Sequence, residues 1–310
     1  MKKALITGSE GFVGRHLWKE LEINGYKVFG TSLNEPEIKS DKVFVCDITD
    51  TEKVDNLMKN LRPDYIFHLA AQPSPHHSWT SPKKTFEINT IGTVNLLESI
   101  KNNPGYHPRT LLVGSSVEYG DVPEDKLPIT EETGFDPRSP YAISKLACYY
   151  TAKAYVRVNK IDIVYSASFS HTGPGQGVGF LASDIATQIV EIEKGNKAPL
   201  LLTGYLENLR DYTDVRDVVR AYRLLLDKGK TGERYNVCSG KAISTGDIYQ
   251  GLIKNAYVKI EHSIDPTRNN PSDVPVIIGS HAKITTETGW TPEIPIEQTL
   301  KDLLDWYRSK

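Results

Sequence analysis

The stretch Gly8-Ser9-Glu10-Gly11-Phe12-Val13-Gly14 lies between a short apolar run, Lys3 to Thr7, and a stretch of helical periodicity, Arg15 to Asn24. Three glycines at this spacing suit a nucleotide diphosphate, because they permit a tight turn, let backbone N–H groups approach phosphate, and let helix and strand pack closely. The helix N-terminus adds partial positive charge. A GxxGxxG pattern also occurs in ordinary turns, but its place directly after the first strand favours nucleotide binding.

The rest of the first half alternates between apolar runs and helical stretches. We expect strands at residues 27–31, 43–46, 65–69, 110–113 and 161–166, with helices from about 51, over 87–100 and over 141–158. This order predicts an α/β fold, a Rossmann-type doubly wound parallel sheet with right-handed crossovers.

The second half is less regular and predicts a smaller C-terminal substrate-binding lobe. We expect a Gly/Pro-rich loop at 171–177, a helix at 182–193, a helical unit at 210–227, a strand at 235–238 that returns to the sheet, and two helices after 245 with Trp290 and Pro292 between them. The predicted Rossmann domain is 1–166 plus about 208–244, and the lobe is 167–207 plus 245–310.

Composition limits the classes of protein and partner. The chain has 310 residues, 39% hydrophobic and 25% charged, which is typical of a globular protein. A net charge of −2 gives no broad attraction to nucleic acid or membranes. Cys46, Cys148 and Cys238 are too few and too widely spaced for a disulfide framework or a metal site. Since no apolar leader follows Met1, and no stretch is long enough to span a membrane, we expect a cytoplasmic protein.

The end of the second predicted strand bears on the choice of cofactor. NAD-specific folds carry an acidic residue there, which bonds the adenosine ribose. Here Thr31 and Ser32 follow, so no carboxylate is expected to repel a 2′-phosphate, and the sequence favours NADP(H) over NAD(H). Asp47, with Ile48 beside it, is expected either to contact adenine or to cap the helix from about 51.

Small residues follow the fourth predicted strand, where the chain could pass beneath a cofactor. The predicted cofactor contacts are therefore Gly8, Gly11, Phe12, Val13, Gly14, Thr31, Ser32, Asp47, Ile48, Leu69, Ala70 and Ala71, together with Tyr141 and Lys145. His68, within the same strand, is expected to be a core histidine.

Tyr141 and Lys145 are the predicted catalytic pair, with Ser115. They lie one helical turn apart, so their side chains leave the same face of the helix. An ammonium group near a phenol lowers the phenol pKa and makes it an acid–base group for carbonyl–alcohol interconversion. Ser115, at the end of the fifth predicted strand, could bond the same oxygen. With a hydride from nicotinamide, this set would complete an oxidoreduction.

The motifs together resemble those of the extended short-chain dehydrogenases/reductases that act on nucleotide sugars. The resemblance covers essentially the whole chain and rests on the stretches Thr7 to Gly14, Leu69-Ala70-Ala71, Ser115 with Tyr119-Gly120, and Tyr141 with Lys145. Four later stretches are similar to the GDP-4-keto-6-deoxymannose reductases, which reduce a C4 ketone to give GDP-D-rhamnose: 171–176, 210–219, 235–240 and 271–275. This implies a role in polysaccharide biosynthesis.

The resemblance also implies a set of substrate contacts. These are Ser116, Ser170, Gln176, Arg210, Arg268 and Asp273. Arg210 would hold the diphosphate of the sugar nucleotide, as guanidinium geometry suits. The chain departs from the reductase pattern where Arg-x-x-Asn is usual, since Ala167 and Ser170 stand there, and where Asn270 replaces an Arg.

A further departure separates the chain from the related 4,6-dehydratases. Those enzymes carry a Glu two residues before the position of Tyr119, and it acts in elimination; here Val117 stands there. Glu118 is adjacent, but one residue's shift in an extended segment turns a side chain to the opposite face. A 4-keto nucleotide-sugar reductase is therefore the first hypothesis and an NAD-dependent nucleotide-sugar epimerase the second. A dehydratase and a non-catalytic nucleotide sensor come last.

The resemblance finally implies a homodimer. In the family, helices beginning near Glu87 and Tyr141 pack against their copies in a four-helix bundle. Tyr149, Tyr150, Ala152 and Tyr155 could supply that face, or could pack within the monomer's own core.

Overall fold

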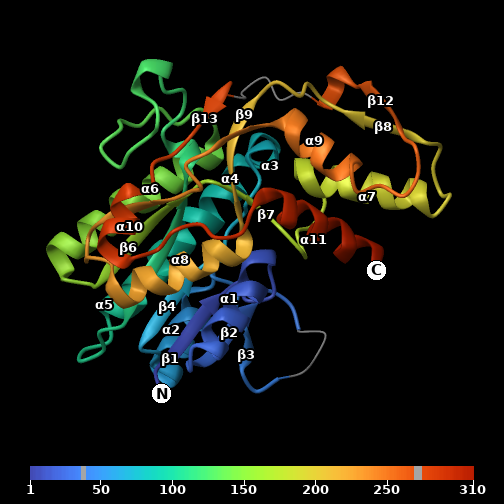
Figure 1. Ribbon diagram of the computed structural model, residues 1–310. Helices are drawn as coiled ribbons and strands as arrows, with labels where there is room; N and C mark the ends of the chain where they lie inside the picture. The colour runs from blue at the N-terminus through green and yellow to red at the C-terminus, as the bar shows by residue number, and fades with distance from the viewer. Residues whose placement is uncertain (36–39, 269–273) are drawn as a thin grey trace.

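The computed structural model describes residues 1–35, 40–268 and 274–310, and in them a seven-stranded sheet is the central element (Figure 1). Its strand order is β10-β6-β5-β4-β1-β2-β3, and every neighbouring pair is parallel. The strands are β1 (Lys3–Thr7), β2 (Lys27–Ser32), β3 (Val43–Val45), β4 (Tyr65–His68), β5 (Arg109–Ser115), β6 (Ile163–Ser168) and β10 (Arg234–Val237). The predicted doubly wound parallel sheet is confirmed.

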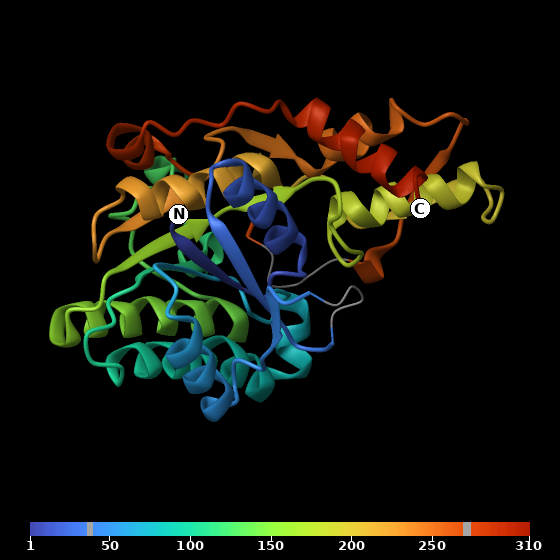
Figure 2. The same ribbon diagram turned by 90° about the horizontal axis from the view of Figure 1, so that it is seen from below.

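Helices cover both faces of this sheet, as Figure 2 shows. One face carries α1 (Phe12–Ile23), α8 (Val215–Lys228) and α10 (Ala282–Thr288), and the other carries α2 (Thr51–Leu61), α5 (Gly92–Lys101) and α6 (Pro140–Asn159). Along β1, Ala4 and Ile6 belong to the core under α1 and α8, whereas Leu5 belongs to the opposite core. Successive residues thus bury opposite faces, which is why these strands are apolar throughout.

The helix predicted over 87–100 is longer and not uniform. It runs from α4 (Pro82–Phe86) through one π-helical turn (Glu87–Ile91) into α5, and the short α3 (Pro75–Thr80) precedes it. Single π-turns inside helices are often found at functional sites. This one faces α6 beside the predicted catalytic pair.

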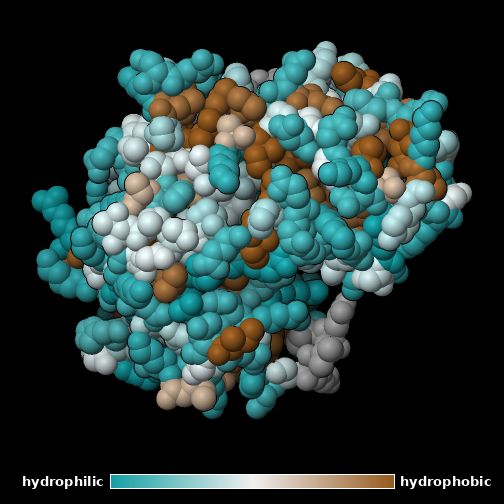
Figure 3. Space-filling model, in the orientation of Figure 1, coloured by the Kyte–Doolittle hydropathy of each residue, from teal (hydrophilic) through white to brown (hydrophobic). Residues whose placement is uncertain are grey.

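The smaller lobe has its own core and its own sheets. β9 (Leu209–Asp214) pairs with β7 (Ser170–Thr172), β11 (Ala242–Ser244) and β13 (Val276–Ile277), and β8 (Leu200–Thr203) pairs with β12 (Glu261–Ile264). Helices α7 (Leu181–Glu193), α9 (Thr245–Ile253) and α11 (Ile296–Arg308) share one apolar core. On the face drawn in Figure 3, hydrophobic side chains gather mainly in the upper half, where this lobe lies.

Three features of the second half differ from expectation. Among the described residues, three helices rather than two follow residue 244, and Trp290 lies between α10 and α11. Ile284 and Trp290 pack in the core of the large sheet, where the Trp290 indole donates to the Asp217 carbonyl at 2.9 Å. Conversely, β9 and β11 pair in the small lobe's sheet. The predicted division into two lobes remains a prediction. In the structure, Ile284 and Trp290 pack with the large sheet, whereas β9 and β11 pair in the sheet of the small lobe.

A buried ion pair links the turn after β5 to strands β6 and β10. Glu118 is fully buried, in a 3₁₀ turn (Ser116–Glu118) that follows β5, and its carboxylate lies 3.1 Å from the guanidinium of Arg234 on β10. The same carboxylate accepts hydrogen bonds from the Ser115 N–H at 2.7 Å and from the Tyr165 hydroxyl on β6 at 2.9 Å. One charged group therefore holds three neighbouring strands in register.

Aromatic rings complete the surroundings of Arg234. Its guanidinium carbon lies 4.3 Å from the ring centre of Tyr119, 4.6 Å from that of Phe135 and 5.0 Å from that of Tyr149. The Nε, Nη1 and Nη2 atoms make no hydrogen bond within the described part of the chain. Ring faces attract a desolvated cation but do not replace hydrogen bonds, so Arg234 depends on Glu118 for its charge balance.

The pair predicts a non-additive response to mutation. Arg234→Met alone should lower the free energy of unfolding by about 3–5 kcal/mol, because it leaves a buried carboxylate unpaired. Adding Glu118→Gln, which keeps an oxygen for Ser115 and Tyr165, should restore most of that loss. Urea denaturation of the two single variants and the double variant measures the coupling.

Lys83→Met is the matched control, since it removes a cation from an ion pair whose lysine is 91% exposed. It should change stability by less than about 1 kcal/mol. An Arg234→Met variant no less stable than this control would contradict the assignment.

Candidate active site

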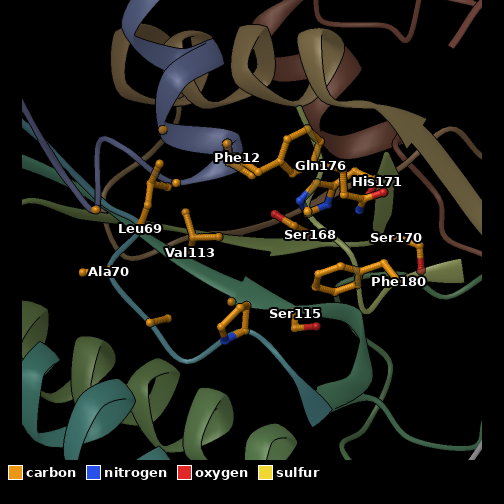
Figure 4. Close-up of a pocket in the computed structure, with 18 of the residues that line it drawn as sticks. Phe12, Leu69, Ala70, Val113, Ser115, Ser168, Ser170, His171, Gln176 and Phe180 are labelled. Atoms are coloured by element: carbon orange, nitrogen blue, oxygen red, sulfur yellow. The ribbon is translucent and has the colours of Figure 1, made fainter. Parts of the chain in front are cut away.

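A cavity of about 600 Å³ lies at the carboxyl ends of the strands (Figure 4). Its walls are the glycine-rich turn with the start of α1, the ends of β1, β2, β4, β5 and β6, and the loop from β7 to α7. Ligands of doubly wound folds bind at this edge of the sheet. The cavity brings together most of the predicted cofactor and catalytic residues.

The glycine-rich turn has the geometry of a diphosphate cradle. Gly8 has a φ of +71°, and a Cβ on Gly14 would lie 2.5 Å from the Gly8 carbonyl oxygen, so neither position accepts a side chain without strain. Helix α1 begins at Phe12, earlier than expected, and no side chain caps its N-terminus. Its first N–H groups are therefore free of a competing cap and suit an anionic ligand. The residues present fit a dinucleotide cofactor.

The predicted contacts around β4 also line the cavity. Leu69, Ala70 and Ala71 form its floor, and the Thr7 hydroxyl accepts the N–H groups of Leu69 and Ala70 at 3.1 Å each. The same hydroxyl contacts His68 Nδ1 at 2.8 Å. Burial lowers the pKa of His68 to about 3. The side chain is buried, so the prediction of a core histidine is confirmed.

At the end of β2, Thr31 and Ser32 line the cavity as predicted, but one premise about this place is wrong. A carboxylate is present after all, because Glu10 reaches across from the glycine-rich turn and its Oε2 accepts a hydrogen bond from the Ser32 hydroxyl at 2.8 Å. The acidic side chain comes from a different segment, so the residues that follow β2 along the chain gave no sign of it.

Asp47 and Ile48 do not line the cavity. The Asp47 carboxylate accepts the N–H and hydroxyl of Thr49 at 2.9 and 2.8 Å, and Ile48 is buried against Gly92. The alternative capping role is wrong, because Asp50 caps α2 through the Lys53 N–H. The adenine contact stays a prediction. Asp47 is a turn residue, and the short side chain of Asp50 is the one in position to cap.

The three predicted catalytic residues meet in the cavity. The Ser139 side chain caps α6, which places Tyr141 in its first turn and Lys145 one turn later. The Tyr141 phenol is hydrogen-bonded to the Ser115 side chain. Lys145 Nζ donates to the Val113 carbonyl on β5 at 2.9 Å. All three are contributed by the regular elements of the large sheet domain.

The pKa of Tyr141 differs from the sequence-based expectation. Burial raises the phenol pKa above its ordinary value, and the Ser115 hydrogen bond opposes this. Burial also lowers the pKa of the Lys145 ammonium. The expected lowering of the Tyr141 pKa is therefore wrong for this state. The phenol instead keeps its proton, which is the form that can donate to a ketone oxygen.

Val117 and Glu118 point in opposite directions. Val117 lines the cavity, whereas the Glu118 carboxylate is turned into the protein toward Arg234. The segment is a 3₁₀ turn rather than the extended run that we expected, with Ser115 and Glu118 forming a capping box. The expectation that Glu118 faces away from the site is nevertheless confirmed.

Two groups were missed from the sequence. Asn89, on the π-helical turn, donates to the Ser144 hydroxyl at 2.9 Å and accepts the Gln72 N–H at 2.8 Å, which ties the floor loop to α6. Ser168 and Tyr222 line the cavity and share a hydrogen bond of 2.7 Å. A polar residue within an apolar helix was the available signal for Asn89. Ser168 and Tyr222 meet only through the fold.

Only some of the predicted substrate residues are found in the lining of the cavity. Ser116, Ser170 and Gln176 line the cavity, and Figure 4 labels Ser170 and Gln176 beside His171. The Gln176 amide is already used within its loop, by Thr172 at 2.6 Å and the His171 carbonyl at 3.1 Å.

Another predicted substrate residue, Arg210, donates to the carbonyls of Leu209 and Pro275 at 2.9 and 3.2 Å and is not among the lining residues. Arg268 ends a 3₁₀ turn (Pro266–Arg268), and its side chain is not among those that the structure describes. Asp273 lies outside the described residues. The substrate roles of these three residues stay predictions.

Two further kinds of site are absent from the described ranges. Within residues 1–35, 40–268 and 274–310, no group of His, Cys, Asp and Glu side chains could hold a metal ion. Across the same ranges, none of the helices has the length and hydrophobicity to traverse a lipid bilayer.

Comparisons with known proteins place this geometry in a family. The chain is 34% identical over 306 residues to GDP-6-deoxy-D-mannose reductase of Pseudomonas aeruginosa, covering 98% of this chain and 97% of that one. It is 28% identical to GDP-mannose 4,6-dehydratase of Yersinia enterocolitica, covering 98% and 93%. The solved structure of RMD from Pseudomonas aeruginosa complexed with NADPH superposes with a TM-score of 0.88 at 33% identity, covering 100% and 99%.

The model of the GDP-mannose 4,6 dehydratase family matches residues 5–303. The expected resemblance to extended short-chain dehydrogenases/reductases is thereby confirmed, in sequence and in fold. The chain belongs to the GDP-mannose 4,6 dehydratase family, whose members include both dehydratases and a reductase of GDP-linked sugars.

Proposed function

We propose that the protein is an NADPH-dependent reductase of a 4-keto-6-deoxy sugar carried on a nucleoside diphosphate, with GDP as the first choice and a GDP-D-rhamnose-type alcohol as product. The observation that carries the proposal is the pairing of an intact Ser115, Tyr141 and Lys145 set with an apolar Val117 in the same cavity. The resemblance to a reductase across the full chain, and to a structure solved with NADPH, supports the substrate and the cofactor.

The residues of the chain supply every part of the reaction except the hydride. When bound, the nicotinamide supplies that hydride. Tyr141 holds the proton that the ketone oxygen takes up, and Ser115 orients the phenol through its hydrogen bond. The Lys145 ammonium donates to the Val113 carbonyl, on the same strand as Ser115.

Val117 argues against elimination. A 4,6-dehydratase needs a carboxylate where Val117 lies, and Glu118 cannot serve because its carboxylate is committed to Ser115, Tyr165 and Arg234. An epimerase would use the same three catalytic residues. It would retain its NAD and show no net consumption of reduced cofactor.

The substrate assignment predicts net oxidation of NADPH. Protein mixed with NADPH and GDP-4-keto-6-deoxymannose should consume the cofactor, followed by absorbance, and should do so more slowly with UDP-, CDP- or dTDP-linked keto sugars. No oxidation with any 4-keto nucleotide sugar would contradict the proposal. Tightly bound NAD with no net turnover would instead favour the epimerase.

Tyr141→Phe should lower kcat by about 10²–10⁴-fold, because the ring remains and only the proton donor is lost. The affinity for NADPH, measured by fluorescence titration, should change little. Tyr257→Phe is the matched control, since it removes a hydroxyl from an exposed ring outside the cavity lining. A Tyr141→Phe enzyme that keeps more than about a tenth of the wild-type kcat would show that another group donates the proton.

We further propose a homodimer through a four-helix bundle formed by α5 and α6 with their copies. Support comes from Ile91, Ile143 and Tyr150, which are 50%, 45% and 54% exposed on adjoining helices. Among the four residues of α6 that the sequence offered for the dimer face, Ala152 is buried, and Tyr149 and Tyr155 pack on the monomer's core. Those three follow the alternative that they belong to the monomer's core.

A charge at the centre of this face should prevent association. Ile143→Glu is predicted to sediment as a monomer at micromolar concentration, where the unmodified chain sediments as a dimer. Val158→Glu, at an exposed site near the end of the same helix, tests whether charge alone has the effect. A monomeric wild type would overturn the proposed bundle.

The cytoplasm is the proposed location, and polysaccharide biosynthesis the proposed setting. The three cysteines are free and buried, as suits a reducing compartment.

A further inference from the structure

Glu10 has a fixed position at one end of the cavity. Its carboxylate accepts a hydrogen bond from Ser32, the last residue of β2, which is 8% exposed. The turn that carries Glu10 is tied to the same strand, because Ser9 donates to the Thr31 carbonyl through its N–H at 3.0 Å and its hydroxyl at 3.1 Å. The Gly8 N–H donates to the Thr31 hydroxyl at 3.2 Å. The carboxylate is therefore held by built structure rather than by a free loop.

The charges in the cavity are few and separated. Among its lining residues, all of which the structure describes, only Glu10 and Lys145 carry a formal charge at neutral pH. Lys145 lies beside β5 and α6, with its ammonium on the Val113 carbonyl. Among the lining residues that the structure describes, the end of the cavity at β2 thus presents a carboxylate and no cation.

This end is where a Rossmann fold receives the adenosine ribose of its cofactor. A carboxylate there accepts hydrogen bonds from free ribose hydroxyls. It repels a 2′-phosphate, which carries between one and two negative charges near neutral pH. Glu10 comes from the glycine-rich turn rather than from the end of β2, yet it delivers the acidic group to the same strand end.

We propose that Glu10 sets the discrimination between NADH and NADPH in this chain and enables NADH to compete with NADPH as the reductant. The inference rests on the proposed reductase function. It adds a specificity-determining residue that hydroxyls at the end of β2 alone would not provide. The Ser32 hydroxyl acts with it by orienting the carboxylate.

The test is binding of each cofactor to the full chain without sugar substrate. Dissociation constants for NADH and NADPH are measured by fluorescence titration, at low and at high ionic strength, for the unmodified protein and for Glu10→Gln. The amide keeps an oxygen for Ser32 and removes only the charge. The affinity for NADPH relative to NADH should rise about tenfold at low salt, as expected for one screened repulsion of charges, and less at high salt.

One control and two further variants make the result specific. Glu22→Gln neutralises a carboxylate on α1 that pairs with Lys42 and lies outside the cavity lining, so the affinity ratio should not change. Glu10→Ser, a smaller neutral residue, should repeat the effect if the glutamine variant folds poorly. Ser32→Ala should move the ratio in the same direction but by less, because the carboxylate remains while its orientation is lost.

The outcomes separate this inference from the proposed function. An unchanged ratio in both Glu10 variants, with both cofactors still bound, overturns the role of Glu10 and leaves the reductase standing. A chain that binds neither cofactor contradicts the reductase itself. A ratio that shifts toward NADPH in the Glu10 variants, and not in Glu22→Gln, confirms Glu10 as the discriminating residue.

Discussion

The contact between the Glu118 carboxylate and the Arg234 guanidinium is the constraint on which the active-site end of the sheet depends. A buried charge must be balanced or it destabilises the fold by several kcal/mol. Here the balance requires β10, which comes late in the chain, to lie beside β6 and close to the end of β5. The same carboxylate fixes the Ser115 backbone, so the position of this cavity-lining residue is set by a charge pair outside the cavity.

That constraint also decides the chemistry available to the cavity. Since Glu118 is committed to the interior, the 3₁₀ turn exposes Val117 to the substrate side. Enzymes of one fold can host different reactions when single side chains at the site change. Val117 is thus the side chain that the cavity presents where the resemblance places the glutamate of the dehydratases. The three-residue turn decides which of two neighbouring side chains, Val117 or Glu118, reaches the cavity.

Sequence reasoning succeeded where a local pattern determines the structure. The run from Lys3 through Gly14 and the spacing of Tyr141 and Lys145 are local, and both were placed correctly. It failed at the cap of α2, where Asp50 rather than Asp47 accepts the Lys53 N–H. It also could not tell that Arg210 donates to the Pro275 carbonyl, or that Tyr149 packs against Arg234. These last two contacts leave no mark in composition or periodicity, because each depends on which partner the fold brings near.

Glu10 shows the same limit in its sharpest form. The rule for cofactor choice looks for an acidic residue after the second strand, and by that rule this chain lacks one. The physical requirement is only that a carboxylate lie at the strand's end, whichever segment supplies it. The glycine-rich turn lies against β2 because Ser9 bonds Thr31, and that contact places the neighbouring side chain beside Ser32. A rule that names a sequence position therefore describes a requirement for a group at a place in the fold. Here a residue of the glycine-rich turn supplies the carboxylate at the end of β2, because hydrogen bonds hold that turn against the strand.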